Sequence, residues 1–358
     1  RGFNPDLVQV ITGYGETGAT LVQSGVDKVL FIGSPQVGKL VMKGASSTLT
    51  PVILELGGKD AFVVCDDADL DHCIDIAVRG AFINCGQNCI SAERFLVQEG
   101  IHDEFVRRVL EKLKKTDQGV STQTRCDFGA ITMPGQADHV DKLVQDAVKK
   151  GARVLSGGKK RGTEGKHPTF YEPTVLVDVD LKMDIATEEA FGPVMTVVRW
   201  KTEEELEAIC NSTPYGLGSS IFSKDYSKAE RISQRIVTGM ANINDFAIVP
   251  LIQSLPFGGV RASGFGAFNG KEGLRGFSRA KSITTDRLGI RAAAPGWLQY
   301  PVSSSAKSIV QQAMFMVYGR SWIESAKGCV NMLSLVASAP AKPEKKETAK
   351  NGSKNGTH

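Results

Sequence analysis

The amino-acid sequence predicts an α/β fold in which buried strands alternate with helices. Short apolar runs rich in Val and Ile recur along the chain, and stretches with apolar residues three to four positions apart separate them. This alternation is typical of parallel sheets joined by crossover helices. The 358 residues are enough for about two domains, and 41% hydrophobic with 23% charged residues is ordinary for a globular protein.

The first part of the chain predicts three strands with helices between them. Residues 7–11 and 28–33 are short apolar runs, and residues 51–58 form a third run that closes on two glycines. One helix is expected between the first two runs. Another is expected to begin at Ser34 and Pro35, because Ser is a good N-cap and Pro fits the first helical position.

The middle of the chain continues the same pattern. Residues 67–84 predict a helix, because apolar positions recur at helical spacing behind aspartates that can cap it. Further strands are expected at 94–98, at the end of 140–158 and in the runs PTVLVDV, VMTVVRW and SSIFS, and further helices at 101–115, at the start of 140–158, near 203–211 and near 226–237.

The chain changes character after residue 291. Residues 308–338 are moderately apolar with helical spacing, whereas residues 341–358 are polar and rich in Lys, Asn and Gly, which predicts disorder. The sequence has no run of about 18 apolar residues, so no ordinary membrane span is predicted. The net charge of +4 comes without a basic stripe, which argues against a nucleic-acid partner.

Cys89 is the first candidate for chemistry. The run N-C-G-Q-N-C-I (84–90) follows a predicted helix that Gly86 should stop, and such a turn can present a thiol to a cavity. The alternative is a buried Cys that behaves as a small apolar residue, which is the commoner fate of a free Cys. Cys85 lies four positions away with no His or second Cys pair nearby, so the sequence predicts no zinc site.

Glu55 is the second candidate, because it stands inside an apolar strand in L-E-L-G-G-K (54–59). Burial among apolar side chains raises a carboxyl pKa towards the range of a general base. The alternative is a glutamate at a strand edge that faces water.

A strand, a tight turn and a helix start are predicted at F-I-G-S-P-Q-V-G (31–38), and a helix N-terminus favours a diphosphate. An ordinary strand-to-helix connection is the alternative. The G-x-G-x-x-G match at Gly13–Gly18 lacks a clear acidic partner about 20 residues on, so we interpret it as a strand–helix turn.

Taken in order, these segments resemble the aldehyde dehydrogenase superfamily, from about residue 7 to residue 286. FIGSPQVG resembles the family's phosphate-binding turn, LELGGK its glutamate signature and GQNC its cysteine signature. EEAFGPV (188–194) resembles a further family segment, and PYGLGSSIFS, GMANIND and PFGGVRASGFG follow at the expected distances.

The resemblance implies oxidation of an aldehyde to a carboxylic acid. Cys89 would attack the aldehyde carbon to give a thiohemiacetal, hydride transfer would leave a thioester, and Glu55 would activate the water that hydrolyses it. The implied coenzyme is NAD, with NADP possible. The implied coenzyme contacts are Gly33, Ser34 and Gly38 at the diphosphate, Glu189 at the nicotinamide ribose and Phe191 beside the nicotinamide.

The resemblance also implies a domain plan. It comprises part of a Rossmann-like coenzyme domain (1–57), a second α/β catalytic domain (58–262), a return to the coenzyme domain with an oligomerisation strand at 281–287 (263–290), an amphipathic extension (291–340) and a disordered tail (341–358). The family's oxyanion-hole asparagine and adenosine-ribose lysine would lie upstream of Arg1, so we expect a truncated sequence. The full-length protein is expected to be a dimer or tetramer in an intracellular location, cytoplasmic or endomembrane-associated.

Phe268 stands where many members carry a proton-relay glutamate. In this respect the chain is similar to the branch that acts on medium-chain, fatty and aromatic aldehydes, which implies an apolar substrate tunnel. Residues 308–338 could be an amphipathic membrane anchor, and the alternative is a helix that packs on the protein body.

Two other functions remain open at this stage. A coenzyme-A-acylating relative would use the same cysteine but release the acyl group to a thiol, and Glu55 argues instead for water. An inactive homologue kept for binding or scaffolding, or a truncated splice product, is the other possibility, and the presence of Cys89, Glu55 and Glu189 argues against decay of the site.

Overall fold

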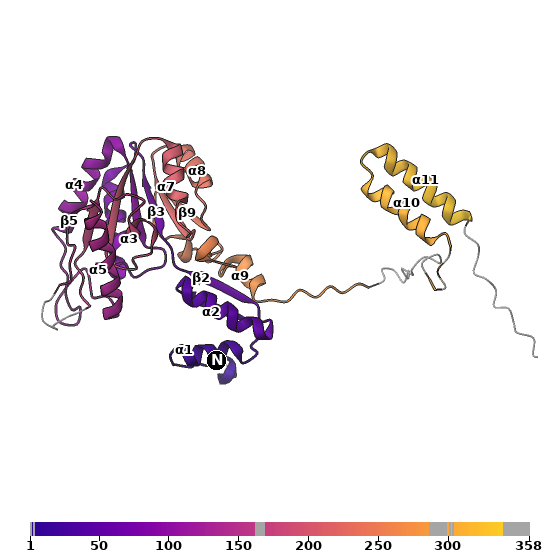
Figure 1. Ribbon diagram of the computed structural model, residues 1–358, viewed down its shortest axis with the longest axis horizontal. Coiled ribbons are helices and arrows are strands. Elements are labelled where there is room, and N and C mark those ends of the chain that lie inside the picture. Colours follow the sequence, from indigo (N-terminus) through magenta and orange to yellow (C-terminus); the bar gives the residue numbers. More distant parts are fainter. Residues whose placement is uncertain are drawn as a thin grey trace, which may run out of the picture. The chain divides into compact units, whose positions relative to one another are not determined.

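The computed structural model describes residues 2, 4–161, 169–285, 299–300, 302 and 304–338. The chain divides into two compact units, Arg1–Arg279 and Ala280–His358. The first unit contains two sheets with their helices, and the described part of the second contains a pair of helices (Figure 1).

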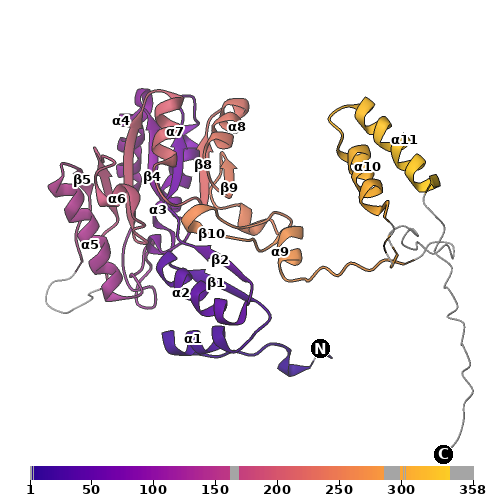
Figure 2. The same ribbon diagram turned by 45° about the vertical axis from the view of Figure 1, so that its right-hand side comes forward.

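A small three-stranded sheet has the order β1-β2-β10. β1 (Val29–Gly33) and β2 (Val52–Leu56) are parallel, and β10 (Gly264–Phe265) returns to pair antiparallel with β2. Helix α1 (Gly15–Gln23) precedes β1, and α2 (Pro35–Ala45) joins β1 to β2. Figure 2 shows these elements together below the larger sheet.

The larger sheet has seven strands in the order β5-β6-β7-β4-β3-β8-β9. Neighbouring strands are parallel except β5 and β6, which are antiparallel. The strands are β3 (Asp60–Val64), β4 (Ala92–Gln98), β5 (Arg153–Ser156), β6 (Thr174–Val177), β7 (Val194–Trp200), β8 (Gly218–Phe222) and β9 (Met240–Ile243).

Helices cover both faces of the larger sheet, as a mostly parallel sheet requires. Phe62 and Val64 of β3 join one apolar cluster with α3 and α4, whereas Ala61 and Val63 face the opposite cluster with α7 and α8. The helices of the first unit that follow α2 are α3 (Leu70–Phe82), α4 (His102–Leu113), α5 (Pro134–Lys149), α6 (Asp184–Thr187), α7 (Glu203–Asn211), α8 (Tyr226–Arg235) and α9 (Gly270–Gly276).

The described helices of the second unit are α10 (Ala306–Tyr318) and α11 (Trp322–Ser338). They approach closely at Gly328, where an added Cβ would lie 2.7 Å from the backbone nitrogen of Met316. None of the described helices is long and apolar enough to cross a membrane.

Most predicted elements are confirmed. The strands expected at 28–33 and 51–58 are β1 and β2, and the helix expected at 67–84 is α3, which Asp69 caps through hydrogen bonds from two backbone amides. The helix expected from Ser34 is α2, with the Val37 amide donating to the Ser34 hydroxyl at 3.4 Å.

The strand predicted at 7–11 is wrong. Pro5–Leu7 form a single 3-10 turn, and residues 8–11 are exposed and belong to no strand. An isolated apolar run cannot satisfy its backbone groups as a strand, because those hydrogen bonds need a neighbouring strand. Residues 281–285 also carry no strand, and the last two residues of the run predicted at 281–287 lie outside the described residues.

Candidate active site

Cys89 lies in the loop between α3 and β4, and three consecutive residues in left-handed backbone shape that loop. Asn84, Cys85 and Gly86 have φ values of 52°, 58° and 70°. Gly86 cannot be replaced without a clash, because an added Cβ would lie 2.0 Å from the carbonyl oxygen of Gly192. The cysteine loop is therefore fitted closely to the segment around Gly192.

Gln87 fixes the same loop by side-chain hydrogen bonds. Its Nε2 donates to the Asn84 carbonyl at 3.0 Å, and its Oε1 accepts from the Thr132 amide at 2.8 Å. The Asn84 side chain donates to the Gln87 carbonyl at 2.9 Å. These positioning roles cannot be predicted from local sequence, because Thr132 meets the loop only in the tertiary structure.

Glu55 lies in β2 and is 2% exposed. Its backbone pairs with Ile32 on one side and Gly264 on the other, so strands on both sides hold it. The interpretation of Glu55 as an exposed edge residue is therefore excluded. Burial raises the pKa of the Glu55 carboxyl, and a hydrogen bond with the Cys89 thiol partly opposes that rise.

The Cys89 thiol faces this carboxyl. It interacts with Glu55 and also lies 3.7 Å from Oδ1 of Asn88. Burial raises the pKa of the Cys89 thiol, and the neighbouring Glu55 charge raises it further. A thiol in this state needs a base to become a nucleophile, and the Glu55 carboxyl beside it is a group that can accept a proton.

One carboxylate oxygen of Glu55 is free to accept a further hydrogen bond. Its Oε1 is buried and has no hydrogen-bond partner among the described residues. A buried acceptor without a partner is costly, so its place at a cavity suits a water molecule or another donor brought by a substrate.

Cys89 and Glu55 line a cavity of about 880 Å³ in the first unit. Its size is within the range of small-molecule and cofactor sites. The other lining residues are Ile32, Gly33, Ser34, Gln36, Gly57, Gln87, Asn88, Gln136, His139, Glu188, Glu189, Phe191 and Tyr215. Six of the seven predicted site residues thus meet in one cavity, and Gly38 is the exception.

Gly38 lies one turn into α2, where it is buried and an added Cβ would be 2.7 Å from the Leu56 side chain. Its amide donates to the Ser34 carbonyl at 2.9 Å, so that amide is already used inside the helix. Gly33, Ser34 and Gln36 place the N-terminus of α2 at the cavity instead. The contact of Gly38 with a diphosphate stays a prediction.

Glu189 reaches the cavity from the turn between α6 and β7. Its Oε1 accepts a hydrogen bond from the Gly58 amide at 3.0 Å, and an added Cβ on Gly57 would overlap its carboxylate. Burial, with the Glu93 charge as the next cause, raises the pKa of the Glu189 carboxyl to about 8. Phe191 follows in left-handed backbone, with φ 44°.

Two buried charges behind this turn were not identified from the sequence. Lys59 and Glu93 form an ion pair in which both side chains are almost fully buried. A charged residue in the otherwise apolar strand AERFLVQ was the available signal for Glu93, and Lys59 belongs to LELGGK itself. Tyr215 and His139 also line the cavity, and burial raises the pKa of Tyr215 to about 12.

The other side of Cys89 is apolar. Cys89 packs against a cluster formed by Ile90, Leu217, Met240, Val249 and Phe257. Phe268 joins the cluster by stacking on Phe257, with ring centroids 4.5 Å apart. By contrast, Cys85 packs in a separate apolar cluster, and burial raises the pKa of its thiol to about 12.

The described residues contain no group of three or more His, Cys, Asp or Glu side chains that could hold a metal ion. The G-x-G-x-x-G match at Gly13–Gly18 lies at the exposed start of α1 and is not among the residues that line the cavity.

Residues 1–283 match the model of the aldehyde dehydrogenase family. The chain belongs to this family. Among its curated relatives, an aldehyde dehydrogenase-like protein of Schizosaccharomyces pombe is 40% identical over 328 residues, which cover 90% of this chain and 62% of that protein. Aldehyde dehydrogenase 1A1 of Oryctolagus cuniculus is 38% identical over 286 residues, 79% of this chain and 57% of that one.

Solved structures give the same result. Betaine aldehyde dehydrogenase from Staphylococcus aureus in complex with NAD+ aligns with a TM-score of 0.68 at 36% identity, covering 72% of this chain and 51% of that one. An NADP-dependent enzyme of E. coli aligns with a TM-score of 0.71 at 33% identity, covering 75% and 55%. The predicted α/β fold of the family is confirmed, and the chain spans about half the length of these relatives.

Proposed function

We propose that this protein oxidises an aldehyde to a carboxylic acid with NAD+ or NADP+. The observation that carries the proposal is that Cys89, Glu55 and Glu189 meet in one cavity at the N-terminus of α2. These residues come from three separate parts of the chain, and each belongs to a segment that resembles a family signature. Family membership and the relatives with NAD+ and NADP add support.

The chemistry of the residues accounts for the reaction. Glu55 accepts the proton of the Cys89 thiol, and the sulfur adds to the aldehyde carbon to give a thiohemiacetal oxyanion. A bound NAD+ or NADP+ would supply the hydride acceptor, and loss of hydride from that carbon would leave a thioester on Cys89. Glu55 releases that proton to solvent and then takes a proton from water as the hydroxyl adds to the thioester. The carboxylic acid leaves, and the proton on Glu55 passes to the Cys89 sulfur.

The cavity suits a dinucleotide in three respects. The N-terminus of α2 favours a negatively charged diphosphate. The Glu189 carboxyl group can accept hydrogen bonds from ribose hydroxyls, and the absence of a Cβ at Gly57 leaves room for that carboxyl group. Phe191 offers an aromatic face for a nicotinamide ring. We assign Gly33, Ser34, Glu189 and Phe191 to coenzyme binding on this basis.

An apolar aldehyde fits the apolar packing around Cys89, whose cluster includes Phe257 and Phe268, better than a charged one does, because a charged group loses hydration beside apolar side chains. A medium-chain, fatty or aromatic aldehyde is the proposed substrate class. The name of one relative at 38% identity, retinal dehydrogenase 2 of Homo sapiens, indicates an apolar aldehyde of the same chemical type.

Replacement of the proposed nucleophile tests the function. In Cys89→Ser, reduction of NAD+ or NADP+ by an apolar aldehyde should fall by at least about 1000-fold. Cys85→Ala is the matched control, because Cys85 lies four positions earlier outside the cavity, and its activity should persist. Unchanged turnover in Cys89→Ser would refute the assignment. Turnover that depended strictly on coenzyme A, with an acyl-coenzyme A thioester as the product, would replace water by a thiol as the acyl acceptor.

Two proposals about partners go with this function. We propose that the protein forms a homo-oligomer through residues 281–287, whose described part exposes Ile283 at 74%. We also propose that α10 and α11 bind an anionic membrane surface. Both expose apolar and aromatic side chains such as Phe315 and Trp322, and basic residues outnumber acidic ones in residues 304–358. Light scattering tests the first proposal, and co-sedimentation with anionic vesicles tests the second.

A further inference from the structure

Glu93 is a buried carboxylate that the proposed mechanism does not use. It lies in β4, four residues after Cys89, and is 2% exposed. Its carboxylate accepts hydrogen bonds from the backbone amides of Ala190 at 2.8 Å and Phe191 at 2.9 Å. A buried carboxylate is tolerated only when its oxygens are satisfied, and here two amides and the Lys59 ammonium satisfy them.

The two amides belong to the turn that carries the proposed coenzyme residues. Phe191 has a left-handed backbone, which is unfavourable for a residue with a side chain unless its surroundings hold it. The Glu93 carboxylate accepts hydrogen bonds from two successive backbone N–H groups of this turn and so stabilises its strained backbone. The side chains of Glu189 and Phe191 face the cavity on the other side.

Lys59 connects the same turn to the glutamate signature. The Gly58 amide donates to the Glu189 carboxylate at 3.0 Å, and the next residue, Lys59, pairs with Glu93. Lys59 also attracts the Glu189 charge. If Glu93 lost its charge, Glu189 would ionise more readily, because the Glu93 charge helps to raise its pKa. The ionised Glu189 would then be attracted by the buried Lys59 cation and drawn away from the cavity.

We propose that Glu93 is a positioning residue that sets the geometry of the turn Glu189–Phe191 for the coenzyme, with Lys59 as its counter-ion. This inference rests on the proposed function, in which Glu189 and Phe191 contact the coenzyme. Glu93 acts through the backbone of the turn and touches neither substrate nor coenzyme. It therefore controls coenzyme binding and leaves the thiol of Cys89 in place.

The test uses Glu93→Gln, which keeps the size of the side chain and removes its charge. Three measurements are made on the same protein: hydrogen exchange of the segment 188–194, NADH affinity by fluorescence, and the rate at which iodoacetamide alkylates Cys89. The exchange should speed up and NADH affinity should fall about tenfold or more, because two charge-assisted hydrogen bonds are weakened. The alkylation rate should stay within about twofold.

The matched control is Thr196→Val. The Thr196 hydroxyl donates to the backbone carbonyl of Glu93 at 2.8 Å and is equally buried, but it does not touch the carboxylate. This variant should leave exchange at 188–194 and NADH affinity unchanged. An equal loss of affinity in Thr196→Val would overturn the proposal, because general loosening of β4 would then explain both results.

Two further outcomes separate the possibilities. Unchanged exchange and unchanged NADH affinity in folded Glu93→Gln would overturn the positioning role. The unsubstituted protein could also bind no NADH while Glu93→Gln shows faster exchange. That result would support the positioning of the turn by Glu93 and reject the proposed function. If Glu93→Gln does not fold, the double variant with Lys59→Met removes the unpaired cation and should show the same faster exchange.

Discussion

At the residue scale, the main feature of the candidate site is a set of buried or partly buried carboxyl groups. Glu55, Glu189 and Glu93 are all at least partly buried within one region, and each is held by groups from a different strand or turn. Burial opposes ionisation, so the site favours neutral forms unless a positive or donor group is near. Lys59 supplies the positive charge for Glu93, whereas Glu55 and Glu189 keep raised pKa values.

The raised pKa of Glu189 predicts a specific dependence of stability on pH. The folded protein holds this proton up to about pH 8, whereas the unfolded chain releases it near 4.5. The stabilisation is therefore complete below about pH 4.5 and is lost as the pH rises through about 8. Glu189→Gln should flatten the fall in unfolding free energy over this window, measured by urea denaturation from pH 5 to 9. Parallel curves for the two proteins would contradict the raised pKa.

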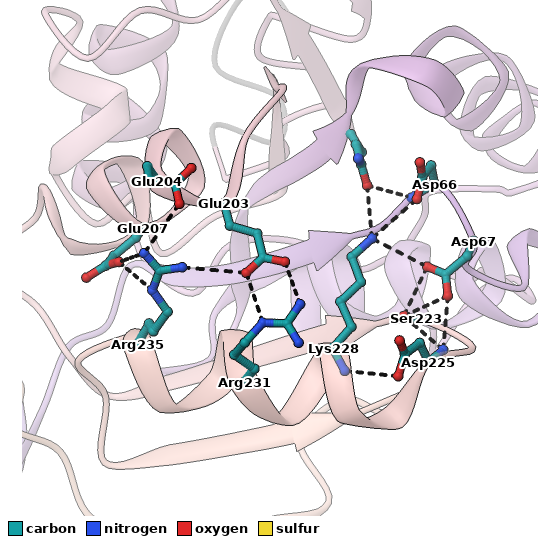
Figure 3. Close-up of polar contacts among 11 residues, drawn as sticks. Asp66, Asp67, Glu203, Glu204, Glu207, Ser223, Asp225, Lys228, Arg231 and Arg235 are labelled. Carbon is teal, nitrogen blue, oxygen red and sulfur yellow. Dashed lines mark hydrogen bonds and ion pairs between the residues drawn. The ribbon is translucent and has the colours of Figure 1, made fainter.

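At the element scale, α7 and α8 are joined by a network of ion pairs (Figure 3). Arg231 of α8 pairs with Glu203 of α7 at 2.7 Å, and Arg235 reaches both Glu203 and Glu207. Nearer the start of α8, Lys228 pairs with Asp66 at 3.3 Å. The pairs between arginine and glutamate hold the two helices together, whereas Lys228 ties α8 to the turn after β3.

Glu203 is the shared member of this network, so its loss should have a measurable effect. Glu203→Gln breaks the pairs with both arginines, and we expect the thermal unfolding midpoint to fall by about 1–3 °C at low salt. Because exposed charges are screened, the difference should shrink in about 1 M NaCl. A difference that persisted at high salt would show that packing, not charge, was lost.

At the scale of the whole first unit, the site depends on the return of the chain to β2. Gly264 of β10 pairs with Glu55, with φ 105°, and an added Cβ would lie 2.0 Å from the Leu54 carbonyl oxygen. Only glycine suits this close approach between two backbones. The second strand neighbour of Glu55 is therefore supplied by a segment far along the chain.

Substitution at Gly264 tests this dependence. Gly264→Ala should destabilise the protein by about 1–3 kcal/mol through backbone strain alone, and more from the clash with Leu54. The matched control is Gly18→Ala in α1, where nothing lies within 4 Å of the added Cβ and a gain of up to about 1 kcal/mol is expected. Urea denaturation measures both, and equal stability of Gly264→Ala and the unsubstituted protein would contradict the close approach.

The sequence by itself determined most of the local elements and predicted six of the residues that line the cavity. Hydrophobic period and capping residues predicted α2 and α3 correctly, because these signals act within a few residues of the chain. The motifs that resemble the family predicted Cys89, Glu55 and Glu189 as site residues, and all three line the cavity. The apolar run at 7–11 predicts a strand that does not form, because a strand also needs a partner that local sequence does not supply.

Only the tertiary structure decided which groups meet and in what state. Glu93 and Lys59 pair across 34 positions of sequence, and the Gly58 amide meets Glu189 across 131. It also showed that Gly38 packs on Leu56 while the N-terminus of α2 lines the cavity. Hydrogen bonds and burial depend on distances in space, and a pKa depends on the charges and solvent around a group. None of these three properties can be derived from spacing along the chain.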